Sequence, residues 1–339
     1  MTRRRLFLAA AVAAVSAGVA TAAFAWGAMG HREIGVAAMH ALPAEMPAFL
    51  RTRHAATEVG ELAREPDRWK DSGKIHDTDR EPAHFVNIGD DGHVYEGPAI
   101  DQLPPTREAY ERALHASGKQ DMTIVGWLPY ALVDNYQQLA KDFAYWRVDT
   151  AAAARAKTKA RRAWFTADRV RREALILRDI GEFGHYVGDG SQPLHVSVHY
   201  NGWGKEFPNP NGYTLNHIHG PFEGALVHDG VSQADVEKHM RPYAPCKDAI
   251  EGCVGDYLKA TLRQVEPLYQ MEKAGGMKPG DPRGRAFAAA RLGDGASQLR
   301  DFIVDAWRAS ETLPVGWPKV TLKDVQSGTD PYESLYGKD

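Results

Sequence analysis

The chain has few cysteines: only Cys246 and Cys253 occur among its 339 residues. Two thiols exclude a structural zinc site made of four cysteines, because no second pair exists to complete it. In an oxidising compartment these two residues, which lie close together in the sequence, would form one local disulfide. The alternative is a pair of free thiols that contributes to a zinc site.

Long apolar runs are also scarce, and the only one lies in residues 1–25. A basic start, an alanine-rich apolar run and a small-residue ending at Ala25 together predict a secretory signal peptide. A membrane anchor is the alternative, but no later segment reaches the roughly 18 apolar residues of a spanning helix. The pair Arg4-Arg5 also resembles a twin-arginine signal, so the export route stays open. We therefore expect a secreted or periplasmic protein without a membrane anchor.

Excess positive charge is lacking as well. Removal of Arg3, Arg4 and Arg5 with the signal peptide would lower the formal charge from −3 to −6 and leave 314 residues (339 minus 25). The mature chain is then mildly acidic and has no electrostatic footprint of a tight duplex-DNA binder. A nucleic-acid substrate is still compatible with this charge, because a metal cluster can supply positive charge where a phosphate binds.

Strand signals are few, and helical periodicity dominates. Apolar residues from Leu128 to Phe143 recur at spacings of three and four, which predicts one face of a helix. Similar patterns predict helices over 32–42, 105–116, 151–187, 249–271 and 284–311, and Gly/Pro/Asn-rich segments predict loops over 90–98, 201–216 and 275–284. The alanine-, lysine- and arginine-rich stretch 151–162 is typical of a solvated helix face. We expect an all-α domain over 26–314 and a polar tail over 315–339 that covers the surface or is disordered.

The most informative motif places His185, Asp189 and His195 at H-x-x-x-D-x-x-x-x-x-H spacing. Residues four apart share a helix face, so His185 and Asp189 can bind one ion. The break at 190–193 would then turn His195 toward the same region. A buried, hydrogen-bonded His–Asp pair without a metal is the alternative.

Further ligand candidates strengthen the metal interpretation. His219 and Glu223 repeat the one-turn spacing, whereas His217 does not, and Asp67 and His84 add a carboxylate and an imidazole upstream. Asp71 competes with Asp67. Nitrogen and carboxylate ligands without thiolate suit zinc, and several carboxylates together suit a multinuclear hydrolytic site.

With the Trp26-Gly27 and Gly30-His31 pairs that follow the predicted cleavage site, these motifs resemble the S1/P1 nuclease family. That family shares a superfamily with the zinc-dependent bacterial phospholipases C, and the resemblance covers residues 26 to about 224. It implies a helical phospholipase C/P1 nuclease-like domain with three zinc ions. The implied ligand sets are Asp67, His84, His185 and Asp189; His195, His219 and Glu223; and the free Trp26 terminus, His31 and Asp189.

The resemblance also implies catalytic roles for Asp67, Lys70 and Asp189, with Lys70 near the scissile phosphate, and substrate contacts by Phe85 and Asn87. The implied activity is hydrolysis of single-stranded DNA or RNA to 5′-phosphate products, with no stable protein partner.

Three departures keep other functions open. Glu223 replaces the usual nuclease aspartate and matches the phospholipases C, Asn87 replaces a frequent aspartate, and the loop 201–216 lacks a Gly-Gly-Asn signature. A general-base role is therefore not transferred to Asn87. The alternatives are a phospholipase C acting on phosphatidylcholine-like lipids and a non-catalytic zinc-binding protein. Trp203 is either an exposed loop aromatic or a platform for the substrate, and His76, His93 and His199 are interpreted as loop residues or supports of the ligands.

Overall fold

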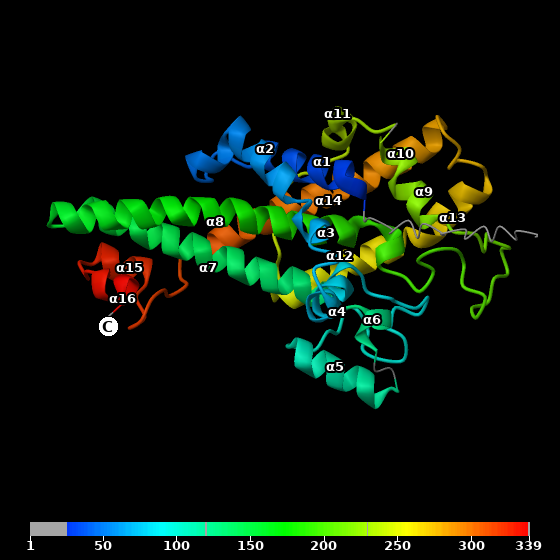
Figure 1. The fold of residues 1–339 in the computed structure, drawn as a ribbon, viewed down its shortest axis with the longest axis horizontal. Coiled ribbons are helices and arrows are strands. Elements are labelled where there is room, and N and C mark those ends of the chain that lie inside the picture. Colours follow the sequence, from blue (N-terminus) through cyan, green and yellow to red (C-terminus); the bar gives the residue numbers. More distant parts are fainter. Residues whose placement is uncertain (1–25, 119–120, 229, 338–339) are drawn as a thin grey trace, which may run out of the picture.

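The computed structural model describes residues 26–118, 121–228 and 230–337 (Figure 1). The predicted signal peptide, residues 1–25, lies outside the described residues. The described part contains helices and isolated β-bridges but no strand, so the expected all-α class is confirmed. None of its helices combines the length and apolar character needed to span a membrane.

The elements follow one another as short and long helices. Those up to the first long helix are α1 (Gly27–His40), η1 (Ala48–Arg51), α2 (Arg53–Leu62), α3 (Glu65–Arg68), α4 (Lys74–Arg80), η2 (Glu81–His84), α5 (Arg107–Ala116), α6 (Met122–Val125) and α7 (Leu128–Arg155). The remaining ones are α8 (Lys159–Ser191), η3 (Pro193–His195), α9 (His219–Glu223), α10 (Ala225–His228), α11 (Gln233–Lys238), α12 (Ile250–Leu262), α13 (Val265–Lys273), α14 (Pro282–Ala309), α15 (Leu322–Gln326) and α16 (Tyr332–Tyr336).

Two long antiparallel helices, α7 and α8, form the frame of the molecule and make its most extensive helix–helix contact (Figure 1). Helices α1 and α2 pack on each other and on α8, and α14 packs against α1, α7 and α8. The core between them is fully buried and includes Ile34, Leu132, Phe183 and Phe302. Burial of such side chains supplies most of the stability of the fold, at about 1.5–3 kcal/mol each.

The helix breaks differ from the periodicity-based predictions. The expected helix over 151–187 is interrupted, because α7 ends at Arg155 and α8 begins after Thr158, whose hydroxyl accepts a hydrogen bond from the Arg161 amide (3.2 Å). The predicted helix face over 151–162 therefore contains the turn between two helices. The expected helix over 249–271 is likewise two helices, α12 and α13. Apolar spacing continues across such short breaks, so periodicity alone does not locate them.

The C-terminal tail packs on the α7–α8 pair. Val315, Val320 and Val325 are buried against Val148 and Phe165, which lie near the turn between the two helices. The described part of the tail is therefore a surface-packed segment with two short helices, and spaced valines in an otherwise polar sequence are enough to anchor it.

A disulfide joins Cys246 to Cys253 and fastens the segment before α12 to the first turns of that helix. The described residues contain no free cysteine. The expected disulfide is confirmed, and the alternative of two free thiols is wrong.

The α7–α8 interface generates a prediction about pH. Asp149 on α7 is fully buried, and burial, followed by the nearby Asp168, raises its pKa to about 8. The folded protein thus keeps a proton that the unfolded chain releases near pH 4. Because the folded-state pKa is raised, the stability from this proton is complete below about pH 4 and is lost as pH rises through about 8.

We therefore expect Asp149→Asn to be more stable than the wild-type protein at pH 8–9, by about 1–3 kcal/mol, and to differ little from it near pH 4. Thermal unfolding measured across this pH range tests the expectation. Asp134→Asn, which changes an exposed carboxyl on the same helix, is the control. A stability difference that is independent of pH would contradict the assignment.

Candidate metal centre

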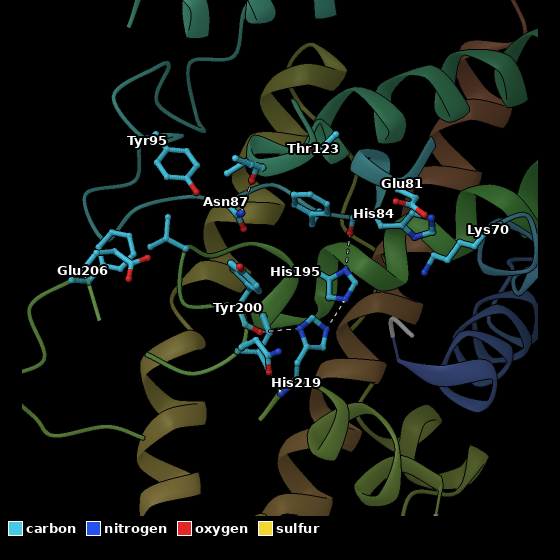
Figure 2. Close-up of a pocket in the computed structure, with 16 residues that line it drawn as sticks. Lys70, Glu81, His84, Asn87, Tyr95, Thr123, His195, Tyr200, Glu206 and His219 are labelled. Atoms are coloured by element: carbon cyan, nitrogen blue, oxygen red, sulfur yellow. Dashed lines mark hydrogen bonds between the residues drawn. The ribbon is translucent and has the colours of Figure 1, made fainter. Parts of the chain in front are cut away.

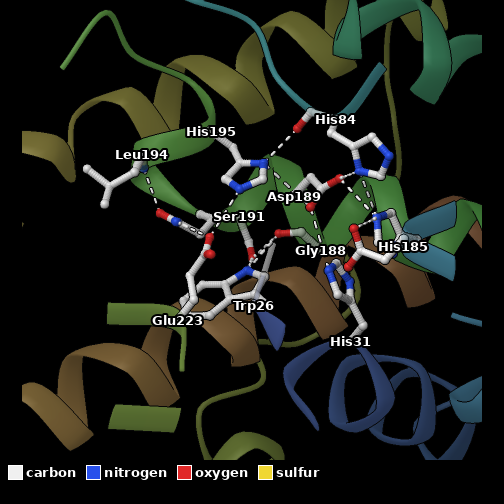
Figure 3. A network of polar contacts seen from close by, with 12 residues as sticks. Trp26, His31, His84, His185, Gly188, Asp189, Ser191, Leu194, His195 and Glu223 are labelled. Carbon is white, nitrogen blue, oxygen red and sulfur yellow. Dashed lines mark hydrogen bonds and ion pairs between the residues drawn. The ribbon is translucent and has the colours of Figure 1, made fainter. Parts of the chain in front are cut away.

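Buried ionisable side chains from five parts of the chain meet at the C-terminal end of α8 (Figure 3). They come from α1, from the segment that holds α3 and η2, from α8 itself, from η3 and from α9. These side chains are His31, Asp67, His84, His185, Asp189, His195, His219 and Glu223. Every one was expected as a ligand from the sequence, and the structure brings all eight together.

Three groups of three residues could each hold a metal ion, because one potential ligand atom per residue lies within 4.8 Å of the others. The groups are His31, His185 and Asp189; Asp67, His84 and His185; and His195, His219 and Glu223. The third matches the expected set, and Asp71 belongs to none of the three.

The first group contains two of the expected ligands, His31 and Asp189, together with His185, which also belongs to the second group. His185 is therefore close enough to serve two neighbouring ions. The terminal amine itself exists only after cleavage at Ala25, and residues 1–25 lie outside the described residues.

Backbone carbonyls fix the tautomer of three imidazoles. The Nδ1 atoms of His185, His195 and His219 lie 2.8, 2.7 and 2.8 Å from the carbonyl oxygens of Ala63, His84 and Tyr200. A carbonyl oxygen can only accept, so each Nδ1 carries the proton and donates it. In its neutral form each ring then presents a lone pair on Nε2, the form that binds a metal.

These lone pairs converge. Nε2 of His195 lies 3.1 Å from Nε2 of His219, and the two nitrogens lie 3.1 and 2.8 Å from the same oxygen, Oε1 of Glu223. Although burial by itself would raise the pKa of Glu223, the two histidines lower it to about 2. Three acceptors facing one another can be held together only by a shared proton or by a cation.

The other half of the centre has the same character. Nδ1 of His84 lies 2.9 Å from Nε2 of His185 and 3.1 Å from Oδ2 of Asp189. Burial lowers the pKa of His185 to about 3 and lowers those of His31 and His84. Burial and then Asp67 raise the pKa of Asp189 well above its usual range. Lone pairs are therefore available at neutral pH, and positive charge is what the centre lacks.

His31 points into this centre from α1. Both of its ring nitrogens are buried and form no hydrogen bond. Oδ1 of Asp189, which lies 3.6 Å from His31 Nε2, is also buried and forms none. Unpartnered buried polar atoms are costly, and a metal ion would satisfy them. The close approach requires Gly188, because a Cβ there would lie 2.8 Å from Nδ1 of His31.

Trp26 anchors the start of α1 beside the centre. Its fully buried indole donates from Nε1 to the carbonyl oxygen of Gly188 (2.8 Å) and to Oγ of Ser191 (3.0 Å) (Figure 3). The first residue of the expected mature chain is thereby tied to the helix that carries two of the ligands.

Gln192 is a supporting residue that the sequence analysis missed. Its fully buried amide donates to Oε1 of Glu223 (2.5 Å) and accepts a hydrogen bond from the amide of Leu194 (2.6 Å). One side chain thus joins a ligand of α9 to the turn that carries His195. Its position between the α8 break and His195 was the only signal in the sequence.

A cavity of about 600 Å³ opens above the histidines. His84, His195 and His219 lie at its inner end, and Lys70 is at its side (Figure 2). The Lys70 ammonium donates to Oδ1 of Asp67 (2.6 Å). The predicted catalytic residue Lys70 therefore lies between the candidate metal ligands and the space that a substrate would enter.

The predicted substrate residues Phe85 and Asn87 both line this cavity. The Asn87 amide donates to the carbonyl oxygen of Ile124 (2.6 Å), which fixes the orientation of the side chain. The outer wall is made by residues that the sequence analysis did not single out, because their loops are placed by tertiary packing. They are Tyr95, Tyr200, Glu206 and Phe207.

Trp203 has neither of its expected roles. Its side chain is 8% exposed, its Nε1 donates to the carbonyl oxygen of Pro208 (2.9 Å), and its ring stacks on His199 at 3.7 Å. His199 in turn contacts Asp90 (3.1 Å). The two residues hold the loop 201–216 against the loop 90–98, so they shape the cavity without facing it.

No protein-family model matches this chain, and no curated protein matches it significantly. The functional interpretation therefore depends on the geometry of the chain's own residues.

The Gln192 contacts predict a change in metal affinity. We expect Gln192→Met, which keeps the side-chain length but removes both hydrogen bonds, to weaken Zn²⁺ binding at the His195–His219–Glu223 group by about 10–100-fold. Zn²⁺ titration and the metal retained after dialysis against a chelator measure the effect. Gln326→Met, at an exposed position, is the control. Retention equal to that of the wild-type protein would show that Gln192 does not support this group.

Proposed function

We propose that this chain is a secreted, zinc-dependent phosphodiesterase of the S1/P1 nuclease type, which hydrolyses single-stranded DNA or RNA and leaves 5′-phosphate products. The observation that carries the proposal is the position of three adjacent groups of buried nitrogen and carboxylate ligands at the inner end of an aromatic-lined cavity. A lone metal-binding group would suit a structural role, whereas adjoining groups with a basic residue and an open cavity suit hydrolysis.

Zinc fits the ligands best among common metal ions. The groups combine neutral imidazole nitrogens with carboxylate oxygens and contain no thiolate, and each supplies three protein ligands, so a further position is open to water or substrate. Asp189 contacts both His84 and His31 through different oxygens, which allows this carboxylate to bridge two cations and to offset their repulsion. When bound, the zinc ions would lower the pKa of a water molecule and stabilise charge on the phosphate oxygens.

The chain's own residues supply the remaining functions. The Lys70 ammonium, held by Asp67 at the side of the cavity, is placed to offset negative charge that develops on the phosphoryl group. Phe85 offers a face for a base, and Asn87 offers a polar group whose amide nitrogen is already committed to Ile124. A base must leave the stack to enter this cavity, so single strands are favoured over duplex.

A second candidate, phospholipase C activity, is favoured by the outer wall of the cavity. Tyr95, Tyr200 and the carboxylate of Glu206 line this region (Figure 2), and Phe207 lines the same cavity. Aromatic faces and a carboxylate suit a quaternary ammonium head group, whereas Glu206 would repel a phosphate backbone. The candidate metal ligands at the inner end of the cavity would suit either phosphodiester, whereas Lys70 at its side favours the nuclease.

A paired assay of the signal-cleaved protein on single-stranded DNA and on phosphatidylcholine tests the proposal, with the metal content determined on the same sample. We expect cleavage of the DNA that a chelator abolishes and that Zn²⁺ restores. Lipid cleavage alone would replace the proposal with the phospholipase, and full zinc occupancy without turnover on either substrate would indicate a non-catalytic zinc protein.

The position of Asp189 predicts the effect of its replacement. We expect Asp189→Asn to lower turnover by at least about 100-fold and to reduce the zinc content, because the amide has lost one of the two anionic oxygens that face His84 and His31. Asp256→Asn, which changes an exposed carboxyl on α12, is the control. Unchanged turnover in Asp189→Asn would remove this residue from the mechanism.

The N-terminus provides a separate prediction. If the α-amino group of Trp26 binds a metal, one extra residue before Trp26 should reduce the zinc content by one ion and lower turnover. Metal analysis of proteins that begin at Trp26 and at one residue before it tests this. Equal zinc content and turnover in the two proteins would refute a terminal ligand.

A further inference from the structure

A cluster of cations occupies the turn between α7 and α8, far from the metal centre. Residues 155–172 contain eight lysines and arginines but only one carboxylate, Asp168, although the mature chain as a whole is acidic. The eight are Arg155, Lys157, Lys159, Arg161, Arg162, Arg169, Arg171 and Arg172. This local concentration of positive charge is not apparent from the net charge, because the protein as a whole is acidic.

Half of these cations are neutralised by neighbours. Arg161 pairs with Asp330, Arg169 with Glu173 (3.5 Å), Arg171 with Asp168 (3.1 Å) and Arg172 with Asp142 (2.9 Å). The Arg172–Asp142 pair joins α8 to α7 and the Arg161–Asp330 pair joins α8 to the tail, whereas the other two pairs lie within α8. Four of the eight cations therefore take part in ion pairs within the fold.

The other four remain uncompensated. Arg155, Lys157, Lys159 and Arg162 are exposed and form no ion pair with any described residue. The two arginines donate to the carbonyl oxygens of residues 151 and 156, which leaves their charge in place. These four residues, here called the turn cluster, form one concentrated positive patch where the two helices meet.

The turn cluster and the metal centre are joined by a single rigid element. Lys159 begins α8 and His185 lies near its other end, about 39 Å away at roughly 1.5 Å per residue (Figure 1). A stacked strand rises about 3.4 Å per nucleotide, so about 12 nucleotides or more are needed to reach from one to the other. A short substrate would meet only the metal centre, whereas a long one could contact both.

We propose that the turn cluster is a second binding surface for the phosphate backbone of long single-stranded nucleic acid, which captures the strand at a distance from the cleavage site. This inference rests on the proposed function. Exposed guanidinium and ammonium groups without protein partners bind phosphates by charge and by hydrogen bonds, independently of base sequence. The acidic remainder of the surface would direct the strand to this patch.

The test neutralises the turn cluster with Arg155→Gln, Lys157→Gln, Lys159→Gln and Arg162→Gln in one zinc-loaded protein. A matched control carries Arg53→Gln, Lys238→Gln, Arg263→Gln and Lys278→Gln, which also removes two arginines and two lysines from exposed positions. Binding of a long phosphorothioate single strand, which resists cleavage, is measured by fluorescence anisotropy at several salt concentrations. Thermal unfolding shows that both variants remain folded.

We expect the turn-cluster variant to bind the long strand about tenfold more weakly at low salt, with a log–log salt slope reduced by roughly 2–3, because each lost contact removes about 0.7. Its KM for a long strand should rise, while cleavage of a dinucleotide stays unchanged. The matched control should retain wild-type binding. Equal long-strand binding by all three proteins would overturn the inference.

Two further outcomes distinguish this inference from a membrane-binding surface and from the proposed nuclease activity. The turn-cluster variant could lose binding to vesicles of phosphatidylglycerol and phosphatidylcholine while it keeps wild-type binding to the oligonucleotide. That result would overturn the inference and indicate a membrane-binding surface instead. Cluster-dependent strand binding by a protein that cleaves no nucleic acid would support the surface while the proposed nuclease activity fails.

Discussion

The hydrogen bonds from three imidazole N–H groups to backbone carbonyls are the constraint on which the metal centre depends. Each one holds a proton on Nδ1 and turns the lone pair of Nε2 inward. The accepting carbonyls belong to Ala63, His84 and Tyr200, which lie in three separate segments. The correct tautomers therefore exist only when those segments are packed together, so the centre is a product of the complete tertiary fold and cannot form on α8 alone.

The position at which helix α8 ends determines how the other ligands come together. Its last turns carry His185 and Asp189 on one face, and Gly188 between them has no side chain, which lets His31 of α1 approach. After the helix stops, Gln192 caps the short turn that carries His195 and reaches Glu223 of α9. A helix that continued past Ser191 would carry His195 away from both partners. The break in the helix is thus as necessary as the ligands.

The pairs His185–Asp189 and His219–Glu223 could be predicted from the sequence because their spacing is local: residues four apart share a helix face wherever the helix lies. Long helices could be predicted for the same reason. The ligand roles of His31, Asp67 and His84 were expected from the family resemblance and not from spacing. The turn at Thr158 was missed, since apolar spacing continues across it, and the sharing of His185 between two groups was missed because it depends on the position of α1. The wall residues Tyr95 and Glu206 come from loops whose placement no local pattern encodes.

The geometry changes the interpretation of a glutamate at position 223. In the sequence, glutamate at this position favours a phospholipase, but in the structure Oε1 contacts His195, His219 and the Gln192 amide at once. The extra methylene of glutamate, relative to aspartate, lets the carboxylate on α9 extend to these partners. The carboxylate faces the metal centre, where both phosphodiesters would present the same phosphate group. Discrimination between a base and a quaternary ammonium group must therefore arise farther out, where Phe85 and Glu206 both line the cavity.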